Sequence, residues 1–144
     1  MRHFVYNVIT AEEAQSLASE VKYLDFNDTR LKGILDIVSG FFPVSCEDPS
    51  YVRVEHKAIG HPWHTDQGNT GHMAWCRYSA EVLLTEPLVD LTGGGFYFRD
   101  TPDDPLFPYL NLITWDGAKE NVHCAATHKG NRRVLIMFFG GRLR

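Results

Sequence analysis

From residue 51 onward the chain consists of short β-rich runs separated by glycine, proline, asparagine and aspartate, and this pattern limits its fold more than any other feature. Short strands at such spacing are typical of a sandwich or a barrel and not of alternating strand and helix units. We therefore predict a mainly β fold, with a barrel or jelly roll over residues 50–140. The candidate strands are 51–58, 61–66, 77–85, 95–99, 109–115, 120–124 and 132–139.

Residues 1–45 are expected to add a strand and two helices that support this core. The strand is predicted over 4–9, and Thr10 then begins a capping box for a helix that continues to about Leu24. Asp28 can cap a second helix, which ends near Gly40. Helical spacing predicts buried positions at Ala14, Leu17, Ala18 and Val21 in the first helix and at Leu31, Ile34, Leu35 and Val38 in the second.

The segment 134–139 is apolar at every position, so both faces of this predicted strand should be buried. The barrel core and the N-terminal helices would cover the two faces, or one face would be a dimer surface. No linker or repeat divides the chain, and 144 residues can bury one core. We therefore expect a single domain over 1–144.

Charge and cysteine content narrow the classes of partner. The net charge is −4, which argues against binding to nucleic acid or to a membrane surface. The three cysteines are well separated and do not suggest a disulfide framework. The first residues show no signal-peptide pattern, and no apolar run has the length of a membrane span. We expect a cytoplasmic protein without a membrane partner.

A metal site is suggested by His64 and Asp66, which flank Thr65 in the predicted strand 61–66. Side chains alternate along a strand, so both would project from one face and could bind one metal. Two histidines and one carboxylate are the ligand set of non-haem Fe(II) oxygenases. The motif alone is weak, because a histidine and an aspartate beside a surface turn would look the same.

The third ligand is expected to be His123, with His128 as the less favoured alternative. The run 121–124 reads as a strand whose hairpin partner begins at Arg132, with turn residues at 129–131 between them. His123 would then lie across from Arg132, while His128 would lie in the turn. The guanidinium of Arg132 matches a carboxylate in two hydrogen bonds, and Arg133 is the alternative.

These residues, taken in order, resemble the Fe(II)/2-oxoglutarate-dependent oxygenases, and most of all the prolyl 4-hydroxylase-like branch. The resemblance covers about residues 50–140. It rests on the His64–Asp66 motif, the strand led by Arg77, the glycines before a strand at 93–98, the apolar strand 112–115, then His123 and 130–132. It implies a double-stranded β-helix, a barrel of the jelly-roll or cupin-like type.

The resemblance also implies the chemistry and its residues. His64, Asp66 and His123 would bind Fe(II), and Arg132 would bind the distal carboxylate of 2-oxoglutarate. With O2 as co-substrate, and ascorbate as a candidate reductant, the enzyme would hydroxylate a C–H bond and release succinate and CO2. The substrate would be a peptide, a protein or a small molecule.

The sequence departs from the family where tyrosines usually contact the co-substrate. The corresponding regions read Glu55-His56 and Val82-Leu83-Leu84. Tyr51, His61 and Tyr78 are candidate replacements, and none is assigned.

Substrate contacts are expected from the loop 67–75, with His72 and Trp75, and from Trp63. Burial in the core is the alternative for both tryptophans.

Two other functions are kept open. A cupin-like metal dioxygenase that does not use 2-oxoglutarate would have no need of Arg132. A non-catalytic jelly-roll binding domain would never bring His64, Asp66 and His123 together. A nucleic-acid demethylase of the same superfamily is disfavoured by the acidic balance.

Overall fold

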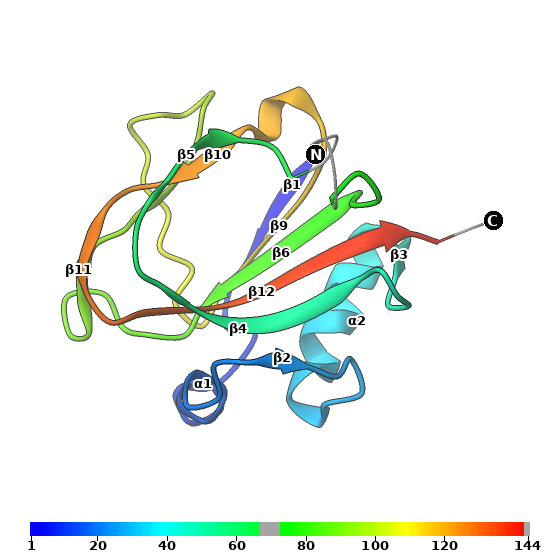
Figure 1. The fold of residues 1–144 in the computed structure, drawn as a ribbon, viewed down its shortest axis with the longest axis horizontal. Coiled ribbons are helices and arrows are strands. Elements are labelled where there is room, and N and C mark those ends of the chain that lie inside the picture. The colour runs from blue at the N-terminus through cyan, green and yellow to red at the C-terminus, as the bar shows by residue number, and fades with distance from the viewer. Residues whose placement is uncertain (67–72, 143–144) are drawn as a thin grey trace.

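The computed structural model describes residues 1–66 and 73–142, and it is mostly β sheet with few helices (Figure 1). The helices are α1 (Ala11–Ala18) and α2 (Lys32–Phe41), with short 3₁₀ helices at Thr29–Leu31 and Lys119–Asn121. The strands are β1 (Arg2–Val5), β2 (Tyr23–Leu24), β3 (Val44–Ser45), β4 (Tyr51–Lys57), β5 (His61–His64), β6 (Tyr78–Leu83), β7 (Leu91–Gly93), β8 (Phe96–Phe98), β9 (Leu112–Asp116), β10 (His123–Ala125), β11 (His128–Gly130) and β12 (Arg132–Gly141).

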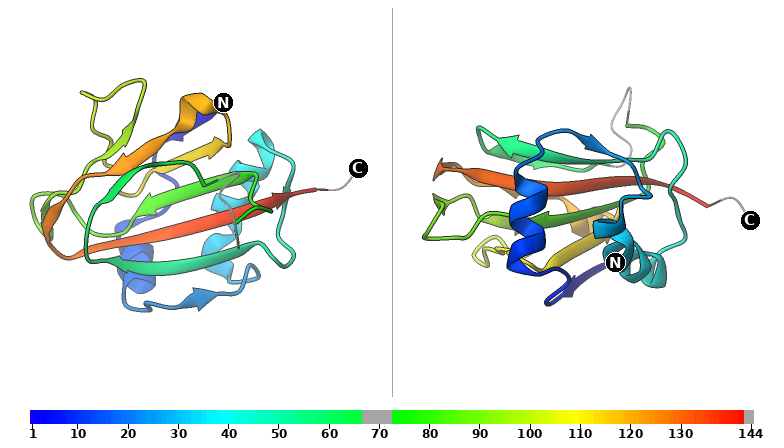
Figure 2. Two further views of the ribbon diagram at one scale, coloured as in Figure 1. Left: turned by 45° about the horizontal axis from the view of Figure 1, so that its top comes forward. Right: turned by 90° about the horizontal axis from the view of Figure 1, so that it is seen from below.

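The strands form one large sheet and two small ones. The large sheet runs in the order β1-β9-β6-β12-β4-β2, and β3 pairs with the end of β12. A second sheet has the order β5-β10-β8, and β11 pairs with β7. β5 and β10 lie on one side of the large sheet, and α1 and α2 cover its other face (Figures 1 and 2). The large sheet is therefore the middle layer of the molecule.

The central strand β12 is buried on both faces, as the sequence predicted. Leu135, Met137 and Phe139 belong to the main core, together with side chains from α1 and α2. Ile136 and Phe138 are on the opposite face, in a second cluster. The apolar run thus separates the helix-covered core from the space between the sheets.

The N-terminal capping box is confirmed. The Thr10 hydroxyl accepts from the Glu13 backbone N–H, and the Glu13 carboxylate accepts from the Thr10 backbone N–H, both at 3.1 Å. The predicted helix end near Leu24 is wrong, because α1 stops at Ala18. The chain then extends to form β2 against β4, and Val21, predicted to be buried, is 50% exposed. Pairing with the edge of the sheet replaces the last turns of helix.

Asp28 begins the second helical segment, as expected. Its carboxylate accepts from the Arg30 backbone N–H at 3.0 Å and caps a 3₁₀ turn that leads directly into α2.

The predicted hairpin between 121–124 and 132–139 is wrong. β10 pairs with β5 and β8, whereas β12 pairs with β3, β4 and β6. The intervening residues are not a tight turn, because β11 pairs with β7. His123 and Arg132 therefore belong to different sheets.

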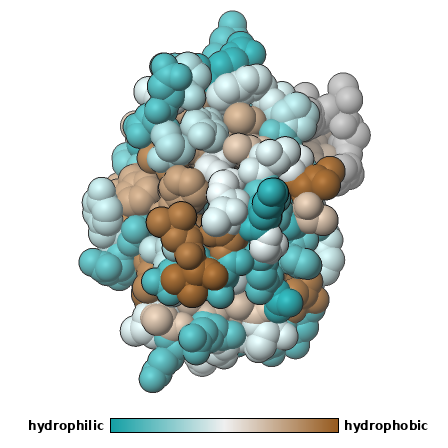
Figure 3. Space-filling model, turned by 90° about the vertical axis from the view of Figure 1, so that its left-hand side faces the viewer, coloured by the Kyte–Doolittle hydropathy of each residue, from teal (hydrophilic) through white to brown (hydrophobic). Residues whose placement is uncertain are grey.

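The surface is mixed in polarity. On the face shown in Figure 3, a small apolar group interrupts a largely polar surface. Leu88 and Val89, in the turn between β6 and β7, are among the most exposed large apolar side chains. Among the described residues, no helix has the length and apolar character needed to cross a bilayer.

Candidate metal centre

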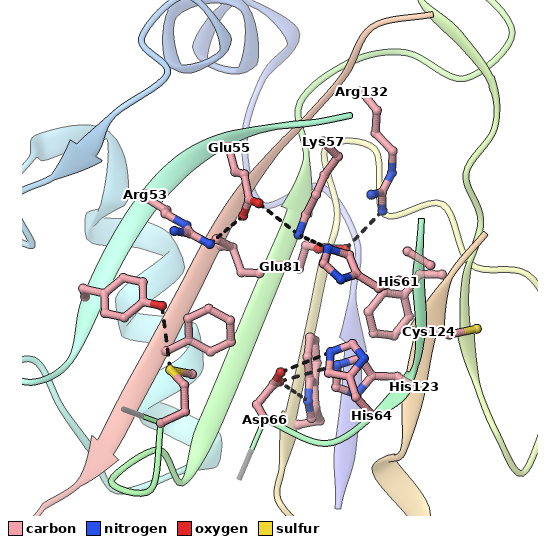
Figure 4. A pocket seen from close by; sticks show the side chains of 17 residues that line it. Arg53, Glu55, Lys57, His61, His64, Asp66, Glu81, His123, Cys124 and Arg132 are labelled. Carbon is pink, nitrogen blue, oxygen red and sulfur yellow. Dashed lines mark hydrogen bonds and ion pairs between the residues drawn. The ribbon is translucent and has the colours of Figure 1, made fainter. Parts of the chain in front are cut away.

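A pocket of about 280 Å³ lies between the large sheet and the β5-β10-β8 sheet (Figure 4). Charged side chains line one end, and histidines and aromatic rings line the other. Its lining residues are Tyr51, Arg53, Glu55, Lys57, His61, His64, Asp66, Met73, Glu81, Phe96, Trp115, His123, Cys124, Ala125, Arg132, Ile136 and Phe138.

The structure brings His64, Asp66 and His123 together in this pocket. His64 and His123 are paired across β5 and β10, and one ligand atom from each of the three residues lies within 4.8 Å of the others. The Asp66 carboxylate is 3.5 Å from Nε2 of each histidine. The expectation that Asp66 lies on the strand is wrong, because β5 ends at His64 and Asp66 lies in the bend that follows. His128 lies on β11 and does not line the pocket.

Both histidines present Nε2 to the same space. The Nδ1 of His123 donates to the Asn121 carbonyl, and that of His64 donates to the Pro62 carbonyl, each at 2.8 Å. A histidine held in this way keeps a proton on Nδ1, so the loss of the Nε2 proton would expose a lone pair to a metal. The ring of His123 also stacks on Phe96, with centroids 5.2 Å apart.

Asp66 is held by donors from the large sheet. Its Oδ2 accepts a hydrogen bond from the Ser79 hydroxyl at 2.7 Å and one from Trp115 Nε1 at 3.2 Å. Burial alone would raise the pKa of Asp66, but hydrogen bonds from His123, His64 and Ser79 outweigh it and hold the pKa well below its usual value. Asp66 is therefore an ionised carboxylate at neutral pH. The hydrogen bond between His64 and Asp66 also raises the pKa of His64.

Arg132 lies at the other end of the pocket and is 2% exposed. Its Nε and Nη1 have no hydrogen-bond partner among the described residues, and Nη2 is 3.9 Å from the buried carboxylate of Glu81. Gly94, at φ +77°, allows the approach, because a Cβ there would lie 3.2 Å from Cδ of Arg132. Buried guanidinium donors without partners are costly, so this end of the pocket is suited to an anion. Arg133 donates instead to the carbonyl of Ala18, on the helix side of the sheet.

Three charged residues of β4 also line the pocket, and the sequence analysis did not assign them a role. Lys57 Nζ is 3.3 Å from Glu55 and donates to His61 Nε2 at 3.2 Å, while Arg53 Nη2 donates to Glu55 at 2.9 Å. Their period-two spacing around the buried Val52 and Val54 is the signal that places them on one face. Glu81, Ser79 and Trp115 were missed as well.

The candidate replacements for the family tyrosines separate clearly. Tyr51 and His61 line the pocket, and the Tyr51 hydroxyl lies 3.8 Å from the sulfur of Met73. Tyr78 stacks on Phe42 at the main core and does not line the pocket.

The expected substrate-contacting residues are only partly described. Residues 67–72, with His72, lie outside the described residues. Trp75 packs beside the cluster of Ile136 and Phe138, whereas Trp63 is 41% exposed.

Comparison with known proteins identifies the fold. The sequence matches no protein-family model and no curated protein. Among solved structures, a Pseudomonas putida prolyl-4-hydroxylase superposes with a TM-score of 0.70 at 14% identity, covering 99% of this chain and 93% of that one. The fold is that of the prolyl 4-hydroxylases.

The viral collagen prolyl hydroxylase of Paramecium bursaria Chlorella virus-1 is similar in two structures. A truncated form matches with a TM-score of 0.69 at 12% identity, covering 99% of this chain and 90% of that one. Its 2-oxoglutarate complex matches with a TM-score of 0.69 at 13% identity, covering 99% and 96%. The resemblance inferred from the sequence is thus confirmed for the fold, a jelly-roll-like arrangement that is mostly β sheet.

Proposed function

We propose that the protein is an Fe(II)- and 2-oxoglutarate-dependent dioxygenase that hydroxylates a C–H bond and releases succinate and CO2. The observation that carries the proposal is one pocket with His64, Asp66 and His123 at one end and the unpartnered donors of buried Arg132 at the other (Figure 4). A metal-chelating acid with a second carboxylate would satisfy both ends.

The three side chains fit Fe(II) as a donor set. Two imidazoles, each deprotonated at Nε2 by metal binding, and one ionised carboxylate would occupy one face of the ion and leave the opposite face open. When bound, Fe(II) would supply the redox chemistry that couples O2 to oxidation of the keto acid and of the substrate. The protein's own contribution is to orient the ligands, through the Asn121 and Pro62 carbonyls and through Ser79.

Arg132 fits the distal carboxylate of 2-oxoglutarate. Its buried donors would form charge-assisted hydrogen bonds, which are stronger away from solvent. Phe96 and Trp115 at the metal end would limit where the rest of the co-substrate can lie.

The remaining parts of the proposal rest on the resemblance to the family. Residues 1–144 would act as one oxygenase domain with a double-stranded β-helix core, using O2 and, as reductant, ascorbate. The structural neighbours are described as prolyl hydroxylases, one of them of collagen. This supports a peptide or protein substrate over a small molecule.

The test is an anaerobic titration of the metal-free protein with Fe(II) and then 2-oxoglutarate, followed by the visible charge-transfer band of a chelated keto acid. The wild type should form the band. His123→Ala should abolish it because a ligand is lost. Arg132→Ala should weaken 2-oxoglutarate binding about tenfold or more, since charged hydrogen bonds are removed.

His128→Ala is the matched control and should behave as the wild type. A wild-type protein that binds Fe(II) but forms no band would contradict the use of 2-oxoglutarate and favour a metal dioxygenase of another kind. No tight metal binding at all would leave a non-catalytic binding domain.

A further inference from the structure

We infer that Lys57 is a second cationic contact for the distal carboxylate of the co-substrate, acting beside Arg132 where the sequence lacks the family's tyrosine. The inference rests on the proposed function and makes it more specific. It predicts selection for keto acids that carry a second carboxylate.

Lys57 and Arg132 are neighbours across the sheet. They are register partners on β4 and β12, so their side chains project from one face at the same end of the pocket. Figure 4 shows both head groups at the end away from Asp66 and the two metal-site histidines. Lys57 is 9% exposed and Arg132 is 2% exposed, so solvent screens neither charge effectively.

The charges in this part of the pocket do not balance. Arg53, Lys57 and Arg132 are positive, while Glu55 and Glu81 are negative, which leaves one more cation than carboxylate. Buried charges are strongly destabilising unless they are paired. A single carboxylate from a ligand would restore the balance.

The contacts indicate which cations are available. Arg53 donates to Glu55 at 2.9 Å and to the Tyr23 hydroxyl at 3.4 Å, so its guanidinium already has two partners. Lys57 has a longer contact of 3.3 Å to the same Glu55, and three N–H donors to distribute. Lys57 and Arg132 are therefore the cations that a ligand between the two sheets would meet.

His61 links this end of the pocket to the metal site. Its Nε2 accepts from Lys57 at 3.2 Å, and its ring centroid is 5.8 Å from that of His64. A compact molecule that chelates a metal at His64 would therefore extend toward Lys57.

The experiment measures binding and not turnover, using full-length protein loaded with Mn(II). Two probes are titrated by calorimetry: 2-oxoglutarate, and 2-oxopentanoate, which has the same carbon chain without the distal carboxylate. Lys57→Met and Lys57→Gln should each weaken 2-oxoglutarate binding about tenfold, since a charged hydrogen bond is lost. Binding of 2-oxopentanoate and of Mn(II) should be unchanged.

Lys57→Arg restores the charge and should bind 2-oxoglutarate nearly as the wild type does. Lys22→Gln, at an exposed lysine, is the matched control. If both neutral variants bind 2-oxoglutarate with wild-type affinity, the role of Lys57 is overturned while the proposed function stands. If the metal-loaded wild type does not distinguish the two acids, the distal carboxylate site itself fails, and the inference fails with it. If the Lys57→Met variant does not fold, the affinity of Lys57→Gln for 2-oxoglutarate decides the role of Lys57.

Discussion

The Asp66 carboxylate is positioned by residues that would not touch the metal. Ser79 on β6 and Trp115 on β9 donate to the same oxygen, Oδ2. These strands belong to the large sheet, whereas the two histidines lie on the small one. Ser79 and Trp115 therefore set the direction from which the carboxylate approaches the imidazoles.

Replacing Ser79 by alanine should lower metal affinity about 10- to 100-fold, because hydrogen bonds to a metal-binding carboxylate orient it and tune its basicity. The change removes one buried hydroxyl and should leave the fold intact. Mn(II) affinity measured by calorimetry provides the test. Ser39→Ala, at an exposed helix position, is the control. Equal affinities for both variants would show that Ser79 does not position Asp66.

At the level of elements, the connection between β10 and β12 decides where Arg132 lies. β11 pairs with β7 before the chain enters β12, and this carries the chain from the small sheet to the large one. The last residue of β11, Gly130, has φ +93°, and a Cβ there would lie 2.4 Å from the Asp90 carbonyl. Only glycine fits this connection.

Gly130→Ala should therefore destabilise the protein by more than about 1 kcal/mol, since it adds both backbone strain and a clash with main chain. It should also weaken 2-oxoglutarate binding through displacement of Arg132. Urea unfolding measures the loss of stability. Gly33→Ala in α2, where a Cβ would meet nothing within 4 Å, is the matched comparison and should be neutral or stabilising. Similar losses for the two variants would contradict this explanation.

The elements that follow from local sequence could be predicted. The Thr10 capping box, the Asp28 cap and the two buried faces of β12 depend on neighbouring residues and on periodicity. The pairing of β10 could not be predicted this way. A turn signal at 129–131 favours a hairpin locally, but the partners of β10 come from β5 and β8, far away in sequence.

In the candidate site, too, local spacing could be predicted from the sequence, whereas long-range arrangement could not. The proximity of His64 and Asp66 could be predicted from their spacing, although a bend and not strand alternation produces it. The choice of His123 over His128 agrees with the observed positions, for a different reason than the hairpin. Lys57 was missed because the alternation of β4 shows that its charges share a face but not that this face is enclosed.

At the scale of the whole molecule, the pocket is built from two layers. The small sheet supplies His64 and His123, and the large sheet supplies Arg132 and the donors to Asp66. Any ligand that contacts both ends would connect the layers. The stability of the protein should therefore depend on the ionisation of the site and on what it binds.

This coupling predicts the pH dependence of the metal-free protein. The pKa of Asp66 is lowered on folding, so its contribution is present above its ordinary value of 3.8 and is lost as pH falls through the lower folded value. The pKa of His64 is raised, so its contribution is complete below 6.5 and is lost as pH rises through the folded value. The free energy of unfolding lost in Asp66→Asn should be largest between about pH 4 and pH 6.5.

Chemical denaturation of wild type and Asp66→Asn across this range measures the difference directly. Above about pH 6.5, bound Mn(II) should offset the stability that is lost as His64 deprotonates, because a metal binds the deprotonated imidazoles and competes with protons for them. Mn(II) at 100 times the dissociation constant measured at pH 8 should add about 2.7 kcal/mol to the wild type at that pH, and the same concentration should add less near pH 5. A loss in Asp66→Asn that stayed constant with pH would show that the carboxylate and His64 do not interact in solution.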